Sequence, residues 1–278
     1  MAAGCGYLAE KQGELIFRPT KDTWRGYSTE RYAFDEHWIE VGTDHKLHAW
    51  WAKGDTPDAP VVLYLHGARW NLTGSVTRID RWRQLGFAVF AVDYRGFGKS
   101  SDVPPTEEYA YEDAEAAWEY LDRLAPGRPR IIVGHSLGGA IAAELARRRP
   151  EAAGVVLEAT FTSVGDMVAH SSFSWLPVSL ILTQKFDTLS KVPELKMPVL
   201  IAHGTSDSIV PFEMGQRLYD AVKGPKRFIK VEGASHHNLS YVAFAEYRAA
   251  IRELFGIKEG KGEKGKAERA KEKGKGKS

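Results

Sequence analysis

The chain has 278 residues and only one cysteine, Cys5, so it can form no internal disulfide, and cysteine usage indicates no redox compartment. It has no run of about 18 apolar residues, which excludes a membrane-spanning helix in the sequence as it stands. Histidine and cysteine show no metal-ligand spacing, and we expect neither a metal nor another cofactor. Lysine and arginine number 38 against 36 aspartates and glutamates, so we expect no nucleic-acid partner.

The two ends of the chain differ in composition from its middle. Residues 258–278 are mostly lysine, glutamate and glycine, which predicts a disordered basic tail. Residues 1–14 are predicted to be an N-terminal extension. Within it, Ala2-Ala3-Gly4-Cys5 is similar to the end of a bacterial lipoprotein signal, but the hydrophobic stretch of such a signal is absent. Either the likeness is accidental or Cys5 carries a lipid anchor in the natural precursor, which leaves the location open between the bacterial cytoplasm and the cell envelope.

Residues 15–257 are predicted to form one α/β domain. Apolar residues make up 43% of the chain, enough for a parallel sheet that is buried on both faces. Short apolar runs alternate with helical patterns, as in a parallel sheet built from right-handed crossovers. The expected strands cover residues 36–42, 46–53, 61–65, 87–92, 130–135, 154–157, 198–204 and 227–231, and the expected helices include 75–85 and 107–124.

The most informative motif is Gly-His-Ser-Leu-Gly at residues 134–138. It follows a β-branched run and precedes an alanine-rich helical pattern. This order of strand, sharp turn and helix is typical of a nucleophile elbow, which would expose the hydroxyl of Ser136. The alternative is a glycine-rich helix start that packs tightly or binds phosphate through its N–H groups.

The partners of a nucleophilic serine follow in the order serine, aspartate, histidine. Asp207 comes just after the predicted strand 198–204, and the pair His236 and His237 comes just after the strand 227–231. A serine hydroxyl needs an imidazole to take its proton, and the imidazole needs a carboxylate to orient it. This chain order is that of an α/β-hydrolase. The alternatives are an Asx turn at Asp207 and a surface loop at the histidines.

An oxyanion hole needs two N–H donors. Leu137 would supply the first because it follows the nucleophile, and Ala68 the second because His66-Gly67-Ala68 follows the strand 61–65. His66 is interpreted as a structural hydrogen-bonding residue beneath this turn. Arg69 and Trp70 come next and are candidate substrate-binding residues, with Arg69 either receiving an anionic group or lying on the surface over aromatic neighbours.

Residues 162–196 are too many for a simple crossover, and many of them are apolar. We interpret this segment as a small helical cap over the nucleophile, with Trp175 in a hydrophobic or acyl pocket. The alternative is an ordinary crossover helix packed on the sheet.

From about Leu15 to Phe255 the chain resembles a serine α/β-hydrolase of the bud-emergence branch, which includes acyl-protein thioesterases. The resemblance lies in residues 44–50, 66–67, 93–100, 134–139, 204–211 and 233–236. It implies an eight-stranded, mostly parallel sheet with helices on both faces, and a structural role for Asp93. Because the fourth position of Gly233-Ala234-Ser235-His236 carries the histidine in that branch, it also implies His236 rather than His237.

We therefore predict a serine hydrolase that cleaves small-molecule or lipid-like esters or thioesters through an acyl-enzyme. Ser136 would be the nucleophile, His236 the general base and then acid, and Asp207 the orienting carboxylate. A dehalogenase or epoxide hydrolase would need an aspartate at position 136. The sequence leaves open an amidase, peptidase or acyltransferase with the same triad, and a catalytically slow binding protein of this fold.

Overall fold

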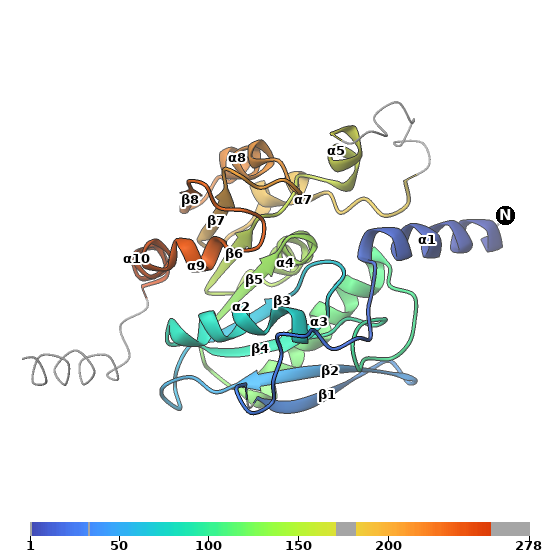
Figure 1. Cartoon of the computed structure of the whole chain (residues 1–278), viewed down its shortest axis with the longest axis horizontal. Coiled ribbons are helices and arrows are strands. Elements are labelled where there is room, and N and C mark those ends of the chain that lie inside the picture. The colour runs from blue at the N-terminus through green and yellow to red at the C-terminus, as the bar shows by residue number, and fades with distance from the viewer. Residues whose placement is uncertain (1, 33, 171–181, 257–278) are drawn as a thin grey trace, which may run out of the picture.

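The computed structural model describes residues 2–32, 34–170 and 182–256 (Figure 1). In this part of the chain, eight strands form one sheet in the order β1-β2-β4-β3-β5-β6-β7-β8. The strands are β1 (Asp35–Val41), β2 (His45–Ala52), β3 (Val61–Leu65), β4 (Ala88–Val92), β5 (Arg130–His135), β6 (Gly154–Glu158), β7 (Val199–Gly204) and β8 (Lys226–Val231). The predicted eight-stranded α/β-hydrolase fold is confirmed.

The direction of the strands determines where a site can form. β1 and β2 pair in antiparallel fashion, as do β2 and β4, whereas all pairs from β4 through β8 are parallel. After β3 the chain crosses to β4 on one side, and after β5 it crosses to β6 on the other. In parallel sheets, ligands bind at the carboxyl ends of the strands where the winding direction changes. Here that point lies between β3 and β5, which are neighbours.

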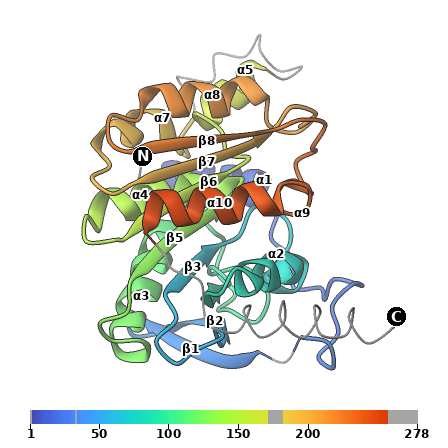
Figure 2. The same cartoon turned by 90° about the vertical axis from the view of Figure 1, so that its left-hand side faces the viewer.

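Helices cover both faces of the sheet. α2 (Leu72–Gln84), α9 (Leu239–Val242) and α10 (Phe244–Phe255) pack on one face (Figure 2). α3 (Glu107–Leu124), α4 (Leu137–Arg148) and α8 (Phe212–Ala221) pack on the other. The predicted stripe on 107–124 faces the core, because Ala114, Trp118 and Leu121 are buried.

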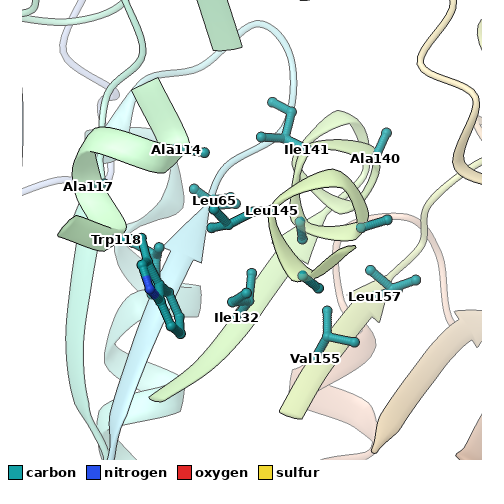
Figure 3. Packing of buried hydrophobic residues seen from close by; sticks show 14 of the residues in the cluster. Leu65, Ala114, Ala117, Trp118, Ile132, Ala140, Ile141, Leu145, Val155 and Leu157 are labelled. Carbon is teal, nitrogen blue, oxygen red and sulfur yellow. The ribbon is translucent and has the colours of Figure 1, made fainter. Parts of the chain in front are cut away.

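The central strands are apolar without alternation because both of their faces are buried. In β3, Val61, Leu63 and Leu65 pack toward α3 and α4, while Val62 and Tyr64 pack toward α2 and α10. Figure 3 shows the first of these layers, with residues of α3 and α4 against those of the strands. Each fully buried side chain of this size contributes roughly 1.5–3 kcal/mol of transfer free energy, so the sheet is a rigid base for the loops at its end.

The N-terminal segment, predicted to be an extension, is the helix α1 (Ala2–Phe17). It extends away from the sheet, with the N-terminus at its far end (Figure 1). Its last residue, Phe17, is fully buried and packs against the rings of Phe97 and Phe186. No helix of the described residues is long and apolar enough to span a membrane. The side chain of Cys5 is not among those described, and a lipid anchor on it stays a prediction.

Around the predicted cap, the structure describes α5 (Val164–Ala169), α7 (Thr188–Lys191) and the 3-10 helix η1 (Val192–Glu194). Phe186 and Val192 are buried in the cluster that also holds α4, so this part of the segment packs as a crossover does. Trp175 belongs to residues 171–181, which are outside the described residues. The predicted tail, 258–278, is outside them as well. The cap interpretation stays a prediction.

Candidate active site

Ser136 lies between β5 and α4 with a φ of 56° and a ψ of −121°. A positive φ is strained for a residue with a side chain, and such strain collects at functional sites. The turn is held on both sides of the serine. Its N–H donates to the Glu158 carbonyl at 2.9 Å, and its carbonyl accepts from Thr160 Oγ1 at 2.6 Å. The elbow predicted from Gly-x-Ser-x-Gly has the expected backbone.

The elbow packs directly against the end of β3. A Cβ on Gly138 would come within 2.1 Å of the Leu65 carbonyl oxygen, so only glycine fits at this position. A Cβ on Gly67 would come 3.2 Å from the Cβ of Ser136. The His66–Gly67 turn and the elbow therefore meet where the topology predicts a site.

Asp207 and His236 approach each other from the ends of β7 and β8. His236 Nδ1 lies 2.8 Å from Asp207 Oδ2, and Asp207 Oδ1 accepts from the N–H groups of Ile209 and Val210 at 2.9 Å each. The carboxylate side chain is fully buried. Burial alone raises the pKa of Asp207, but hydrogen bonds from His203, His236 and the Val210 N–H outweigh it and hold this pKa well below its ordinary value. Asp207 is therefore an anion that faces the imidazole.

The two adjacent histidines differ in their surroundings. His236 is 5% exposed and contacts Asp207, whereas His237 is exposed. Its partial burial and the neighbouring charges of His236 and Arg78 lower the pKa of His237. Of the pair, His236 is therefore the one with a carboxylate partner.

Ser136 and His236 line the same pocket, which has a volume of about 250 Å³. Ala68, Arg69 and Trp70, all predicted from the sequence, line it too. Leu137 directly follows Ser136 at the start of α4. None of the described residues that line this pocket is acidic.

The turn after β3 is braced from below and from the side. His66 is fully buried, with Nδ1 at 2.7 Å from the Gly67 carbonyl and Nε2 at 3.4 Å from Asp93 Oδ1. Asp93 also accepts from the Leu72 N–H at 2.8 Å, which joins the turn to the start of α2. Arg69, at a φ of 77°, donates its N–H to the Phe17 carbonyl at 2.7 Å. The N-terminal helix thus supports the pocket, which the sequence did not predict.

Among the lining residues that sequence reasoning missed, three have large side chains. His135 was treated only as part of the elbow motif, and Ile209 only as part of the turn after Asp207. Arg78 lies on α2 and lines the pocket, where its Nη2 reaches the carbonyls of His236 and His237. No local signal marks it, because an arginine in an amphipathic helix is ordinary. No group of three or more histidine, cysteine, aspartate or glutamate side chains in the described residues is arranged to hold a metal ion.

Comparison with known proteins agrees with this architecture. Residues 56–186 match the Hydrolase_4 family, described as serine aminopeptidase, S33. An uncharacterized protein of Mycobacterium tuberculosis is 30% identical over 235 residues, which are 84% of this chain and 83% of that protein. The human alpha/beta hydrolase domain-containing protein 17B is 30% identical over 220 residues, 78% of this chain and 74% of that protein.

More distant matches carry more specific names. The lysophosphatidylserine lipase ABHD12 of Danio rerio is 27% identical over 258 residues, 81% of this chain, and the match spans 65% of the lipase. An esterase of Pyrococcus furiosus has the same fold, with a TM-score of 0.66 at 20% identity over 86% of this chain and 95% of the esterase.

The chain belongs to the alpha/beta hydrolase superfamily. Within it, the chain is similar to serine hydrolases and esterases. These relatives do not single out the acyl-protein thioesterase branch that the sequence resembles.

Proposed function

We propose that the protein cleaves carboxylic esters or thioesters through an acyl-enzyme on Ser136. The observation that carries this proposal is the 2.8 Å contact between His236 and Asp207, in a pocket that Ser136 and His236 line together. A buried carboxylate, an oriented imidazole and a hydroxyl on a strained elbow are the three parts of a serine nucleophile system.

The contact with Asp207 determines the tautomer of His236. Because the carboxylate can only accept, Nδ1 carries the proton and Nε2 is left unprotonated to act as the base. Nε2 takes the proton of Ser136 Oγ while this oxygen attacks the acyl carbon. It then delivers the proton to the leaving alcohol or thiol, which departs as the acyl-enzyme forms. Water, deprotonated by the same nitrogen, attacks the acyl-enzyme, and the acid is released as the proton returns to Ser136.

The oxyanion would be held by the N–H groups of Leu137 and Ala68. Leu137 is the first residue of α4, where backbone N–H groups and the helix dipole favour negative charge. The next N–H of the turn, that of Arg69, already donates to Phe17 and cannot serve the oxyanion. We therefore keep Ala68 as the proposed donor from the turn.

The pocket walls indicate a lipid-like acyl substrate. Trp70 and Ile209 are large apolar side chains exposed at the pocket, and Arg69 and Arg78 lie near them with no acidic lining residue. An apolar chain next to an anionic group suits this lining. The lipase name of the ABHD12 relative points to the same class. Two finer predictions go with this proposal. One is that the substrate is a thioester, and the other is that Trp175 lies in an acyl pocket.

A peptidase is the second candidate, because the matched family is described as a serine aminopeptidase. An aminopeptidase must accept the cationic α-amine of its substrate close to the scissile bond. A pocket lined by two arginines and no carboxylate disfavours that amine, so the ester reading is preferred.

The test is labelling of the wild type and of Ser136→Ala with a fluorophosphonate probe, followed by turnover of esters, thioesters and aminoacyl amides of increasing chain length. We expect rapid labelling that the mutant loses, and ester or thioester turnover above that of the amides. Failure of a folded wild type to label or to turn over any ester would overturn the proposal and favour a binding protein. Faster turnover of the aminoacyl amides would favour the peptidase.

A further inference from the structure

The loop that carries His236, residues 232–238, is attached to the body on two sides. On the side of Asp207, the Gly233 N–H donates to Thr205 Oγ1 at 2.9 Å and the Ala234 carbonyl accepts from the Ser206 N–H at 3.0 Å. On the opposite side, the attachments come from α2 and from the elbow. Both reach the main-chain carbonyl of His236, and the contact from α2 also reaches that of His237.

His135, the residue before the nucleophile, makes the shorter of these contacts. Its Nε2 lies 2.9 Å from the His236 carbonyl oxygen, although the two residues are 101 positions apart. A carbonyl only accepts, so Nε2 of His135 must carry the proton. Burial, together with nearby Arg78 and His236, holds the pKa of His135 well below its ordinary value. His135 is therefore neutral, with a tautomer set by this bond.

Arg78 makes the other contacts. Its Nη2 lies 3.2 Å from the His237 carbonyl oxygen and 3.5 Å from that of His236. It also lies 3.3 Å from His135 Nε2, which is already a donor, so the guanidinium donates to the carbonyls. None of the ion pairs found in the described part of the chain includes Arg78, so its hydrogen bonds go to the His236 loop instead of to a carboxylate.

We propose that Arg78 and His135 are positioning residues that hold the main-chain carbonyl of His236 and thereby keep its imidazole in reach of Ser136. This inference rests on the function proposed above. Asp207 restrains the imidazole at its Nδ1 end, and these two donors restrain the backbone of the same residue. A general base that is restrained at both places less often adopts orientations in which it cannot take the serine proton.

The alternative role for Arg78 is direct binding of an anionic substrate group, because its side chain lines the pocket. The two roles differ in what they change. A positioning residue affects the rate of the chemical step for every substrate, whereas a binding residue affects the KM of anionic substrates. The contacts to two carbonyls of the His236 loop favour positioning.

The experiment compares Arg78→Met, Arg78→Lys and the control Arg83→Met, whose arginine lies on the same helix and pairs with Asp80. Each is assayed for kcat and KM with a neutral butyrate ester and a succinate ester of the same alcohol, for fluorophosphonate labelling rate and for thermal unfolding. We expect Arg78→Met to lower kcat roughly 100-fold for both esters, with KM little changed and labelling slowed in parallel. Arg78→Lys should restore part of the loss, and Arg83→Met should match the wild type.

A folded Arg78→Met enzyme with wild-type kcat for both esters would refute the proposal, and so would a loss confined to the KM of the succinate ester. If Arg78→Met does not fold, Arg78→Lys decides. Lysine is shorter than arginine and lacks its planar fork, so its ammonium cannot take the position of Nη2 on the two carbonyls; a positioning role therefore lowers kcat for both esters, and an unchanged kcat contradicts it. Since the wild type must label and turn over in these assays while Ser136→Ala does not, failure of the function proposal is recognised separately.

Discussion

The two walls of the pocket differ in how far their side chains are exposed. The buried wall consists of His135 and His236, which Arg78 and Asp207 contact, and these two histidines are only 6% and 5% exposed. The open wall consists of Arg69, Trp70, Ile209 and His237, and Trp70 and Ile209 are 46% and 48% exposed.

This difference assigns the catalytic step to the buried wall and the choice of substrate to the open wall. The side chains of the buried wall have hydrogen-bond partners on several elements, so their orientation is determined before any substrate arrives. Side chains of the open wall keep their rotamer freedom, and water screens their charges. Each of them alone therefore contributes little to the binding free energy of a substrate. We therefore expect changes in the buried wall to remove activity, and changes in the open wall to alter substrate preference.

The largest effect is expected for Asp207→Asn. An amide can turn a donor toward His236 Nδ1, which stabilises the wrong tautomer and leaves Nε2 protonated; in an analogous serine protease this costs about 10⁴ in kcat. We expect a kcat loss of that order with the fold retained, measured by ester turnover and circular dichroism. The matched control is Asp187→Asn at the start of α7, whose carboxylate accepts from the Ser190 N–H away from the pocket. A kcat within tenfold of wild type would contradict the buried wall's catalytic role.

A second prediction concerns Glu158, which is buried beside the elbow. Burial raises its pKa to about 7, against the opposing effects of Arg78 and Tyr247. The stability that this raised pKa contributes is complete below the ordinary value of 4.5 and is lost as pH rises through about 7. The loss amounts to about 3 kcal/mol of unfolding free energy.

The measurement is urea unfolding of the wild type and Glu158→Gln from pH 4.5 to pH 8. We expect the unfolding free energy of the wild type to fall relative to the variant across this range. If the unfolding free energies of the wild type and Glu158→Gln change in parallel with pH, water reaches Glu158 and the region behind the buried wall is accessible to solvent.

The smallest effect is expected for Arg69→Met. Its guanidinium is exposed at the pocket, where a charge contact contributes about 0–1 kcal/mol. The preference for anionic over neutral esters should therefore fall only about 2–5-fold, as measured by kcat/KM for matched succinate and butyrate esters. Glu40→Gln, on β1, is a control for a general change of surface charge. An unchanged preference would remove Arg69 from substrate recognition.

Much of the architecture could be predicted because it rests on local patterns. The apolar runs that predicted the central strands lie in a sheet buried on both faces, so most side chains of these strands are apolar whichever face they point to. The helix at 107–124 was predicted at the bounds of α3, since Thr106 caps its first turn and the apolar stripe has a clear period. The glycine at 138 signalled a contact between backbones that no larger residue permits.

The helix α1 was missed because its signal is not local. Residues 1–17 have a weak apolar period, and what anchors the helix is the burial of Phe17 between Phe97 and Phe186. Those partners lie far along the chain, so composition alone could not reveal that this segment supports the turn at Arg69.

By itself the sequence determined the order of elements, the elbow and the candidates Ser136, Asp207 and His236, because each depends on residues adjacent in the chain. Only the tertiary structure decided that Arg78 and His135 meet the carbonyl of His236, and that His236 is the histidine of the pair whose imidazole contacts Asp207. A hydrogen bond between residues 158 positions apart depends on how helix α2 packs against the sheet, and no local pattern encodes that packing.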